Sequence, residues 1–369
     1  MRRPLRVQAL AAVAVTATLA ACGSSQGGAP AASSSAGSSP VPAPSTVTVA
    51  LGGGFLSIHA PFLAAMQTGA LHAVEQKYGL TVNVQAFGGG NDAMQAVLGG
   101  SADFALVSAS LLAGADFKGQ DLVAVFDQNH GNSTVVIGAK KDESKGTSIK
   151  NYDGANWGYI KEGAPSQLIL QDLATRAGLN WKNQQGVAIG SVDATIPSLQ
   201  SNRIDIVAIG STVAGKAIQL GLAYPILNGN DTDAARKVWG VQIAAPLVTT
   251  HGFARKYPQV TQAIVEAMLK GLMAIKDKAS DTTAAYGLMP SQFTQSVTQD
   301  DFKLSWPLDA PAFKGTDGVF HKDAVDSTIK LLVQQGVLPT KDAVSTDILF
   351  DNQYVLGAYR DLGKTPPTP

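Results

Sequence analysis

Two short motifs in the chain carry residue types that could do chemistry. Residues 210–216 (Gly-Ser-Thr-Val-Ala-Gly-Lys) fit most of a phosphate-binding P-loop, in which Gly-rich backbone and a Lys hold nucleotide phosphates. Ala217 stands where that motif needs the Mg²⁺-binding hydroxyl, so the sequence does not predict nucleotide binding. Residues 23–27 fit the Gly-x-Ser-x-Gly pattern of a nucleophilic Ser, but they lie in a run of small residues and not between a strand and a helix.

Metal and thiol chemistry are also disfavoured by residue type and spacing. The one Cys, Cys22, excludes a disulfide framework and any site that needs several thiolates. The five His residues show no paired spacing typical of zinc ligands, so we expect neither a metal nor a cofactor; they are His59, His72, His130, His251 and His321.

Composition excludes further classes of protein. The chain has 369 residues, with 28 Lys and Arg against 28 Asp and Glu, so it lacks the basic excess of a nucleic-acid-binding protein. A hydrophobic content of 45% provides ample material for a core, and the length fits two domains. We expect a folded, monomeric protein without a nucleic-acid partner.

The N-terminus reads as a secretory signal. Arg2, Arg3 and Arg6 precede an apolar run over residues 7–19 that is too short to span a bilayer, which needs about 20 apolar residues. The run ends in Leu-Ala-Ala-Cys at residues 19–22, which resembles the lipobox of bacterial lipoproteins. That resemblance implies removal of the signal peptide 1–21, lipidation of Cys22, and a membrane-anchored protein on the extracytoplasmic face (periplasmic or cell surface).

A flexible tether is predicted to follow Cys22. In residues 23–45, all positions except Gln26 and Val41 are Gly, Ala, Ser or Pro, and none is charged. Such a segment cannot bury enough apolar surface to fold, and its reach is about 26 Å root-mean-square. Loss of the signal peptide removes three Arg and leaves 25 basic against 28 acidic residues, a mildly acidic protein.

From residue 46 the pattern alternates strands and helices. A β-branched run at 47–51 is followed by three Gly, a helical pattern at 60–78, an alternating strand at 80–87, a helix from Asn91 to Leu98 and an apolar strand at 103–108. Strands that alternate with helices and are buried on both faces predict an α/β fold with parallel sheets.

The same order recurs about a hundred residues later. Residues 92–110 align without gaps on 194–212, which pairs Asp103 with Asp205; we interpret both as structural residues at the turn into a strand. Two lobes are therefore expected: lobe 1 from 46–139 plus 241–369, and lobe 2 from 140–240. Strands at 134–139 and 241–249 are the hinge candidates, and helices at 260–275 and 324–335 are expected to pack on lobe 1.

These features resemble, in their order along the chain, a family of ABC-transporter substrate-binding lipoproteins. The features are the strands at 47–51 and 82–87, Gly-Ala-Pro-Ser at 163–166 before a helix, and Gly-Val-Leu-Pro at 336–339. The resemblance, over about 46–354, is to the group that binds nitrate, sulfonates, taurine and thiamine-pyrimidine precursors in the type II periplasmic-binding fold. It implies two lobes that close over a small molecule and deliver it to an ABC permease, with no enzymatic activity.

The loops that should hold the ligand follow from the fold class. In open α/β sheets, ligands lie beyond the carboxyl ends of strands, where helix N-termini present backbone N–H groups. Each Ser or Gly there can equally serve as a helix cap or turn residue. The candidates are Gly53, Gly54, Phe55, Ser57, His59, Gly89, Gly90, Asn91, Ser108, Ala109, Glu162, Gly163, Ser166, Asp193, Gly210 and Ser211.

The charged residues in these loops indicate what charge the ligand should carry. They contain Asp92, Glu162 and Asp193 against Lys161, with no Arg, so we expect a zwitterionic, cationic or neutral aromatic ligand over an isolated anion, although backbone N–H groups and hydroxyls can hold an anion. Two other functions stay open at this point: a ligand-sensing partner of a signalling receptor, and a pyrimidine-synthase-like enzyme. Relatives with that enzymatic activity use active-site Cys residues, which this chain lacks beyond Cys22.

Overall fold

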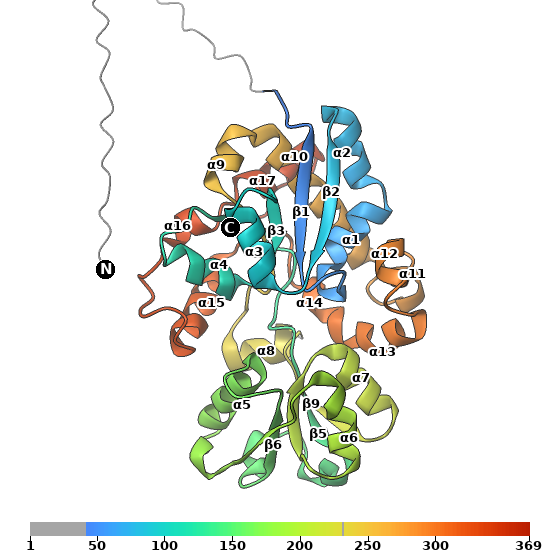
Figure 1. Ribbon diagram of the computed structural model, residues 1–369, viewed down its shortest axis with the longest axis vertical. Helices are drawn as coiled ribbons and strands as arrows, with labels where there is room; N and C mark the ends of the chain where they lie inside the picture. Colours follow the sequence, from blue (N-terminus) through green and yellow to red (C-terminus); the bar gives the residue numbers. More distant parts are fainter. Residues whose placement is uncertain (1–41, 231) are drawn as a thin grey trace, which may run out of the picture. The chain divides into compact units, whose positions relative to one another are not determined.

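The computed structural model describes residues 42–230 and 232–369. The predicted signal peptide, Cys22 and most of the tether lie outside the described residues. The remainder contains two five-stranded sheets, each covered by helices, and Figure 1 shows them as two lobes. The α/β, two-lobed fold class expected from the sequence is confirmed.

The first sheet has the strand order β2-β1-β3-β10-β4. The strands are β1 (Thr46–Gly52), β2 (Thr81–Phe87), β3 (Phe104–Leu106), β4 (Val123–Phe126) and β10 (Leu247–Thr249). β1 pairs in parallel with β2 and β3, as expected, but β10 is antiparallel to both β3 and β4. The sheet is mixed because β10 enters it as the chain returns from the second lobe.

Helices bury both faces of this sheet. On β1, Val47, Val49 and Leu51 point into one core and Ala50 into the other, as strand alternation requires. The first core is covered by α1 (Ala60–Gln67), α2 (Ala70–Tyr78), α10 (Pro258–Lys278) and α17 (Gln353–Asp361), and the second by α3 (Gly90–Leu98), α4 (Ala109–Asp116) and α15 (Lys322–Gln334). The single helix expected at 60–78 is divided into α1 and α2, because Gly69 adopts a left-handed conformation (φ 79°).

Further helices extend the first lobe. They are α9 (His251–Lys256), α11 (Thr282–Tyr286), α12 (Ser291–Thr294), α13 (Gln299–Asp309), α14 (Pro311–Lys314) and α16 (Thr346–Leu349). Aromatic residues of α12 to α14, including Phe302 and Trp306, join the core that α1 and α10 cover. The rings of Phe302 and Trp306 stack at 4.9 Å between centroids, so α13 is part of the first lobe.

The second sheet has the strand order β7-β6-β8-β5-β9. Its strands are β5 (Val135–Ala139), β6 (Asn156–Tyr159), β7 (Gln185–Ala188), β8 (Ile206–Ile209) and β9 (Ala223–Asn228), and its helices are α5 (Pro165–Arg176), α6 (Thr195–Gln200), α7 (Ser211–Gln219) and α8 (Thr232–Trp239). Strand β5 pairs with β8 and β9 and lies in this sheet, whereas the sequence assigned residues 134–139 to the end of lobe 1. Short 3₁₀ helices complete the chain: η1 (Ser57–His59), η2 (Lys140–Lys145), η3 (Ile149–Tyr152), η4 (Trp181–Asn183) and η5 (Val192–Ala194).

The repeat predicted from the sequence is present in both lobes. The unit α3–β3 corresponds to α6–β8, and the two Asp residues make the same contact. Asp103 Oδ2 accepts a hydrogen bond from Thr48 N at 2.8 Å, and Asp205 Oδ2 accepts one from Asn156 N at 2.9 Å. Each carboxylate therefore joins the turn before one strand to the start of the neighbouring strand, which confirms the structural interpretation.

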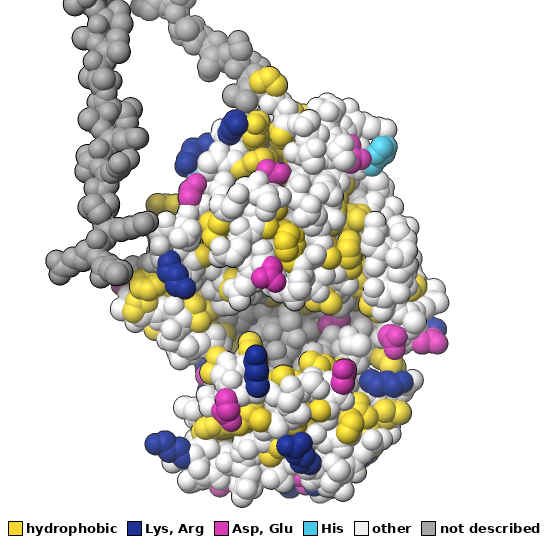
Figure 2. All heavy atoms as spheres, viewed as in Figure 1, with side chains coloured by type: hydrophobic (Ala, Val, Ile, Leu, Met, Phe, Trp, Pro, Cys, Tyr) yellow, Lys and Arg dark blue, Asp and Glu magenta, His cyan; other side chains and the backbone are white. Residues whose placement is uncertain are grey.

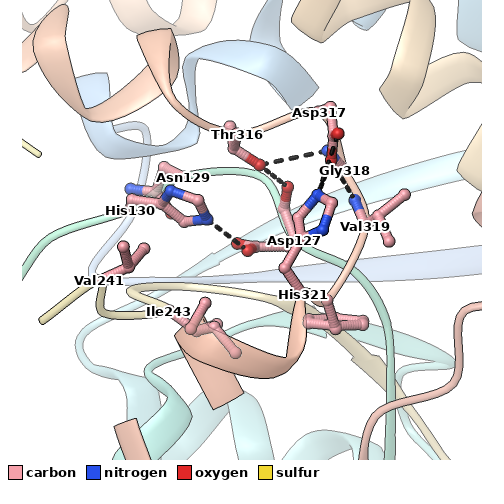
Figure 3. Close-up of polar contacts among 12 residues, drawn as sticks. Asp127, Asn129, His130, Val241, Ile243, Thr316, Asp317, Gly318, Val319 and His321 are labelled. Atoms are coloured by element: carbon pink, nitrogen blue, oxygen red, sulfur yellow. Dashed lines mark hydrogen bonds and ion pairs between the residues drawn. The ribbon is translucent and has the colours of Figure 1, made fainter. Parts of the chain in front are cut away.

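The chain passes between the lobes through residues 127–134 and 240–246, and these two segments pair with each other. Gly131 N donates to Gln242 O at 2.8 Å, Ala244 N donates to Asn129 O at 3.1 Å, and His130 forms a β-bridge with Ile243. Figure 3 shows this crossover. Of the expected hinge strand 241–249, only residues 247–249 are a strand of the first sheet.

A buried pair of hydrogen-bonded side chains lies at the crossover. His130 Nε2 donates to Asp127 Oδ2 at 2.8 Å, and both side chains are almost fully buried (Figure 3). Burial raises the pKa of Asp127, and His130 works against that rise. Thr316 Oγ1 donates to Asp127 O at 2.7 Å, so the first crossover segment is fastened to the first lobe.

Candidate functional site

Two adjoining cavities lie between the lobes. The larger has a volume of about 530 Å³ and the smaller about 440 Å³, within the range of pockets that hold small molecules. Both are lined by residues of both lobes, and they share Leu56, Ile58 and Ser133. The face seen in Figure 2 is hollowed between the two lobes. We take this cleft as the candidate ligand site.

Seven of the residues expected to contact a ligand line these cavities. The larger cavity is lined by His59, Gly90, Ser108 and Ala109. The smaller is lined by Ser57, Gly210 and Ser211. These residues follow β1, β2, β3 and β8, so the structure brings together the carboxyl ends of strands from both sheets.

The other candidates lie outside the two cavities. Gly53 and Gly54 form the turn after β1 with φ of 85° and 86°, and Phe55 packs against the core of the first lobe. The remaining positions are at the loops and helix starts nearby: Gly89, Asn91, Glu162, Gly163, Ser166 and Asp193. The sequence singled out Phe55 because it lies among glycines; in the structure it is half-buried and packs against the core of the first lobe.

Hydrogen bonds within lobe 2 occupy two of these outlying side chains. The Ser166 hydroxyl accepts from Ile160 N at 3.1 Å, which ties the loop to the start of α5. The Tyr159 hydroxyl and the Gln167 amide donate to the Glu162 carboxylate and hold its pKa below the ordinary value. Glu162 is exposed, so its charge is both solvated and locally paired.

Glycines allow two loops of the first lobe to meet in the cleft. A Cβ at Gly52 would lie 2.8 Å from Gly90 Cα, and a Cβ at Gly90 would lie 2.7 Å from Leu111 Cδ1. The α3 N-terminus thus lies directly against the end of β1, which only residues without a side chain permit. Ser108 is the N-cap residue of α4 nearby, and its hydroxyl accepts from Leu111 N at 3.3 Å.

His59 is buried and uncharged at neutral pH. Desolvation lowers its pKa to about 4, against a smaller opposing effect of its hydrogen bond to the backbone of Gly52. In the tautomer that satisfies both neighbours, Nε2–H donates to Gly52 O at 3.2 Å and Nδ1 accepts from Gln128 Nε2 at 3.3 Å. Both ring nitrogens are therefore engaged by the protein, and His59 contributes shape to the cavity instead of charge.

Asp309 is a cleft residue that is not among the site residues expected from the sequence. It ends α13, lines the smaller cavity and is buried. Its Oδ2 accepts from Ser57 Oγ at 2.5 Å and its Oδ1 from Asn230 Nδ2 at 3.2 Å, so both lobes contact one carboxylate. Burial raises the pKa of Asp309 to about 6, partly offset by Ser57 and Ser211. No local signal marks Asp309, because it ends a helix and does not follow a strand.

The walls of the cleft are apolar and nearly free of charge. Among the described residues that line the two cavities, Asp309 is the one charged side chain, and none is Lys or Arg. Leu56, Leu168 and Val192 are 45%, 37% and 45% exposed, and each lines one or both cavities. Half of the six exposed large hydrophobic side chains of the described chain therefore face the cleft.

A further hollow lies outside the cleft, on the first lobe. A cavity of about 460 Å³ lies between α2, α10 and α17, on the first lobe alone, with charges of both signs from Lys77, Glu266, Arg360 and Asp361. Within residues 42–230 and 232–369, no three His, Asp or Glu side chains cluster as metal ligands would. In the same part of the chain, no helix combines the length and apolar character needed to cross a bilayer.

Comparisons with known proteins agree with this geometry. Solved structures with the same fold include a protein of Bordetella bronchiseptica RB50, at 21% identity and a TM-score of 0.67 over 87% of this chain and 99% of that one. They also include the periplasmic sulfonate-binding protein SsuA of Methylobacillus flagellatus KT (15% identity, TM-score 0.66, 88% and 98% covered). A third is the periplasmic nitrate-binding protein NrtA of Synechocystis PCC 6803 (12%, TM-score 0.57, 86% and 89%).

Sequence comparison gives the family directly. No curated protein sequence matches the chain significantly. The model of the NMT1-like family matches residues 42–288, about two thirds of the chain, and this range includes both sheets. The chain belongs to the NMT1-like family and has the fold of the nitrate- and sulfonate-binding periplasmic proteins of ABC transporters.

Proposed function

We propose that the protein is an extracytoplasmic solute-binding protein that captures a small molecule between its lobes and delivers it to an ABC permease. The observation that carries the proposal is the pair of adjoining cavities lined from both lobes. The family and the sulfonate- and nitrate-binding neighbours support a binding role. The chain's single Cys, at position 22, leaves no thiol in the folded part for the Cys-dependent chemistry considered above.

Capture between two lobes predicts closure. A ligand that contacts both lobes stabilises the arrangement in which both contacts are made. A thermal-shift screen of nitrate, taurine, alkanesulfonates, pyrimidines and amines would identify binders, since a ligand at 100 times its Kd adds about 2.7 kcal/mol. Small-angle scattering with the best binder should then give a smaller radius of gyration. An unchanged scattering profile at saturation would contradict capture by closure.

Delivery to a permease needs its own test, since a sensory partner would bind ligand in the same way. The ligand-loaded protein should stimulate ATP hydrolysis by its permease and ATPase reconstituted in vesicles, more than the ligand-free protein does. Stimulation by neither form would favour the sensing role.

The membrane anchor is part of the proposal and rests on Cys22. Several acyl chains on one residue give stable anchoring, at about 0.8 kcal/mol for each buried CH₂. The variant Cys22→Ala should fold normally and move from the detergent phase to the aqueous phase in phase partitioning. A variant that still partitions with detergent would show that Cys22 is not the anchor.

A further inference from the structure

The cleft lacks the partners that a desolvated anion needs. The larger cavity is lined by no charged side chain, and the smaller one by Asp309 alone among the described residues. An anion taken out of water into such a site would have to rely on hydroxyls and backbone N–H groups.

Asp309 lies close to a position in the smaller cavity that could otherwise bind an anion, the N-terminus of α7. Helix α7 begins at Ser211 without a side-chain cap, so its N-terminus would attract an anion. Ser211 and Asp309 line the same cavity, and the Ser211 side chain works to lower the pKa of Asp309, so the carboxylate itself lies close to this helix end. A second anion there would be repelled at close range by the first.

The groups around Asp309 leave its charge unpaired. Its hydrogen-bond donors are Ser57 and Asn230, both neutral, and no described Lys, Arg or His forms an ion pair with it. A carboxylate offers about four acceptor positions, so Asp309 can accept a further donor. A buried charge of this kind is stabilised when a cation occupies the cavity.

The rest of the cleft fits an apolar body. Phe313, Ala312 and Val213 line the smaller cavity beside Asp309. Leu56 and Ile58 are common to both cavities and connect the Asp309 end to the larger one, where Leu168 and Leu331 lie. A molecule with its polar head at Asp309 would therefore extend along aliphatic side chains.

Taking the proposed function as its basis, we propose that the ligand is an organic cation: an apolar body that carries a protonated amine or a similar group, with that group at Asp309. Asp309 then sets the specificity of the cleft for positive charge, and the larger cavity selects the apolar body.

A series of six-carbon probes with different heads tests this. Hexylammonium, hexan-1-ol and hexanesulfonate share one body, and calorimetric titration compares their Kd values. We expect hexylammonium to bind most tightly and hexanesulfonate most weakly. Asp309→Asn, which keeps the size of the side chain, should weaken hexylammonium at least about 30-fold. Asp300→Asn is the matched control, because Asp300 is on the same helix and its side chain is 93% exposed; it should change nothing.

The pH profile of the unmodified protein gives a readout that needs no variant. A bound cation favours ionised Asp309, whose pKa in the free protein is about 6, so the Kd of hexylammonium should rise as pH falls from 7 to 5. The contacts of Asp309 from η1, α7 and the 228–230 loop do not titrate in this range. His59 has a pKa of about 4 and stays neutral, and Asp300, Asp301 and Lys303 are near the opposite end of α13. Asp309→Asn should abolish the dependence.

The outcomes separate the two proposals. Three results would each overturn the organic-cation inference. They are tighter binding of hexanesulfonate than of hexylammonium, an unchanged Kd of hexylammonium in Asp309→Asn, and a Kd of hexylammonium that does not vary with pH. Binding of nitrate, taurine or a pyrimidine with lobe closure, when no six-carbon probe binds, would also overturn it and leave the solute-binding function standing. Failure of every compound to close the lobes would count against the solute-binding function itself.

Discussion

The two lobes share one structural unit and differ in what surrounds it. Asp103 and Asp205 occupy equivalent positions before β3 and β8, and each accepts a backbone N–H from the neighbouring strand. Asp205 also pairs with Lys141 at 2.7 Å, whereas no described cation pairs with Asp103. Burial accordingly raises the pKa of Asp103; for Asp205 the same effect is outweighed by Lys141 and Asn156 N, and its pKa is lowered.

This difference indicates that the repeated helix–strand unit determines the backbone contact of each Asp. Residues outside that unit determine its electrostatic surroundings. Lys141 belongs to η2, an element outside the repeated helix–strand unit. Asp309 likewise belongs to α13, which follows both sheets in the chain and packs on α7 of the second lobe. The cleft's one carboxylate thus comes from a helix outside the repeat.

The largest loss of stability is expected from a substitution at a helix crossing inside lobe 1. It is compared below with a substitution at a contact between the lobes. A Cβ at Gly271 would lie 1.9 Å from Pro61 O, where α10 crosses α1. Because both helices are in one core and neither can withdraw, Gly271→Ala should destabilise the protein by about 3 kcal/mol or more. Denaturant unfolding measures this. Gly89→Ala is the control, because nothing lies within 4 Å of its Cβ; a similar loss in both would contradict the packing argument.

The corresponding contact between the lobes should behave differently. A Cβ at Gly215 on α7 would lie 2.3 Å from Leu304 O on α13. The two lobes can shift apart to relieve this contact, so Gly215→Ala should cost about 1 kcal/mol and mainly change the scattering profile of the free protein. A loss as large as that of Gly271→Ala, with unchanged scattering, would show that the lobes are one rigid body here.

The sequence predicts features that depend on residues close together in the chain. It does not predict features that depend on contacts between residues far apart in the chain. Local periodicity predicts part of the architecture: the strands expected at 47–51, 80–87 and 103–108 correspond to β1, β2 and β3, but periodicity gives no expectation for β4, β7, β9 or the helices α11 to α14. The Asp103–Asp205 equivalence follows from the repeat. The antiparallel β10 and the membership of β5 in the second sheet depend on how the chain crosses between lobes, which local pattern does not encode. Asp309 meets Ser57 across 252 residues, so only the fold brings them together.

The two equivalent aspartates should respond differently to substitution and to pH. Asp205→Asn loses the ion pair with Lys141 and should cost about 1–2 kcal/mol at pH 7, whereas Asp103→Asn should change stability by less than about 1 kcal/mol. Since the folded-state pKa of Asp205 is lowered, its contribution is present above about pH 4 and is lost as pH falls through that pKa. The raised pKa of Asp103 has the opposite effect on stability. Ionised Asp103 destabilises the folded state above its folded-state pKa, and acidification removes this cost.

Unfolding of the two variants at pH 7 and pH 3 checks this pair of predictions. The effect of Asp205→Asn should shrink at pH 3. Equal effects of both substitutions at pH 7 would mean that Lys141 adds nothing to the shared contact.

The smallest effects on ligand affinity are expected from two acidic side chains of lobe 2, Glu162 and Asp193. Glu162 and Asp193 are exposed and line neither cavity, although Pro165 and Leu168, a few residues after Glu162, line the larger one. Glu162 is also paired with Tyr159 and Gln167, so removing its charge leaves no ligand group unpaired. Glu162→Gln and Asp193→Asn should therefore change the Kd of hexylammonium by less than about threefold. A loss of affinity of tenfold or more in either variant would indicate that the cationic group of the ligand binds at that carboxylate of lobe 2 and not at Asp309.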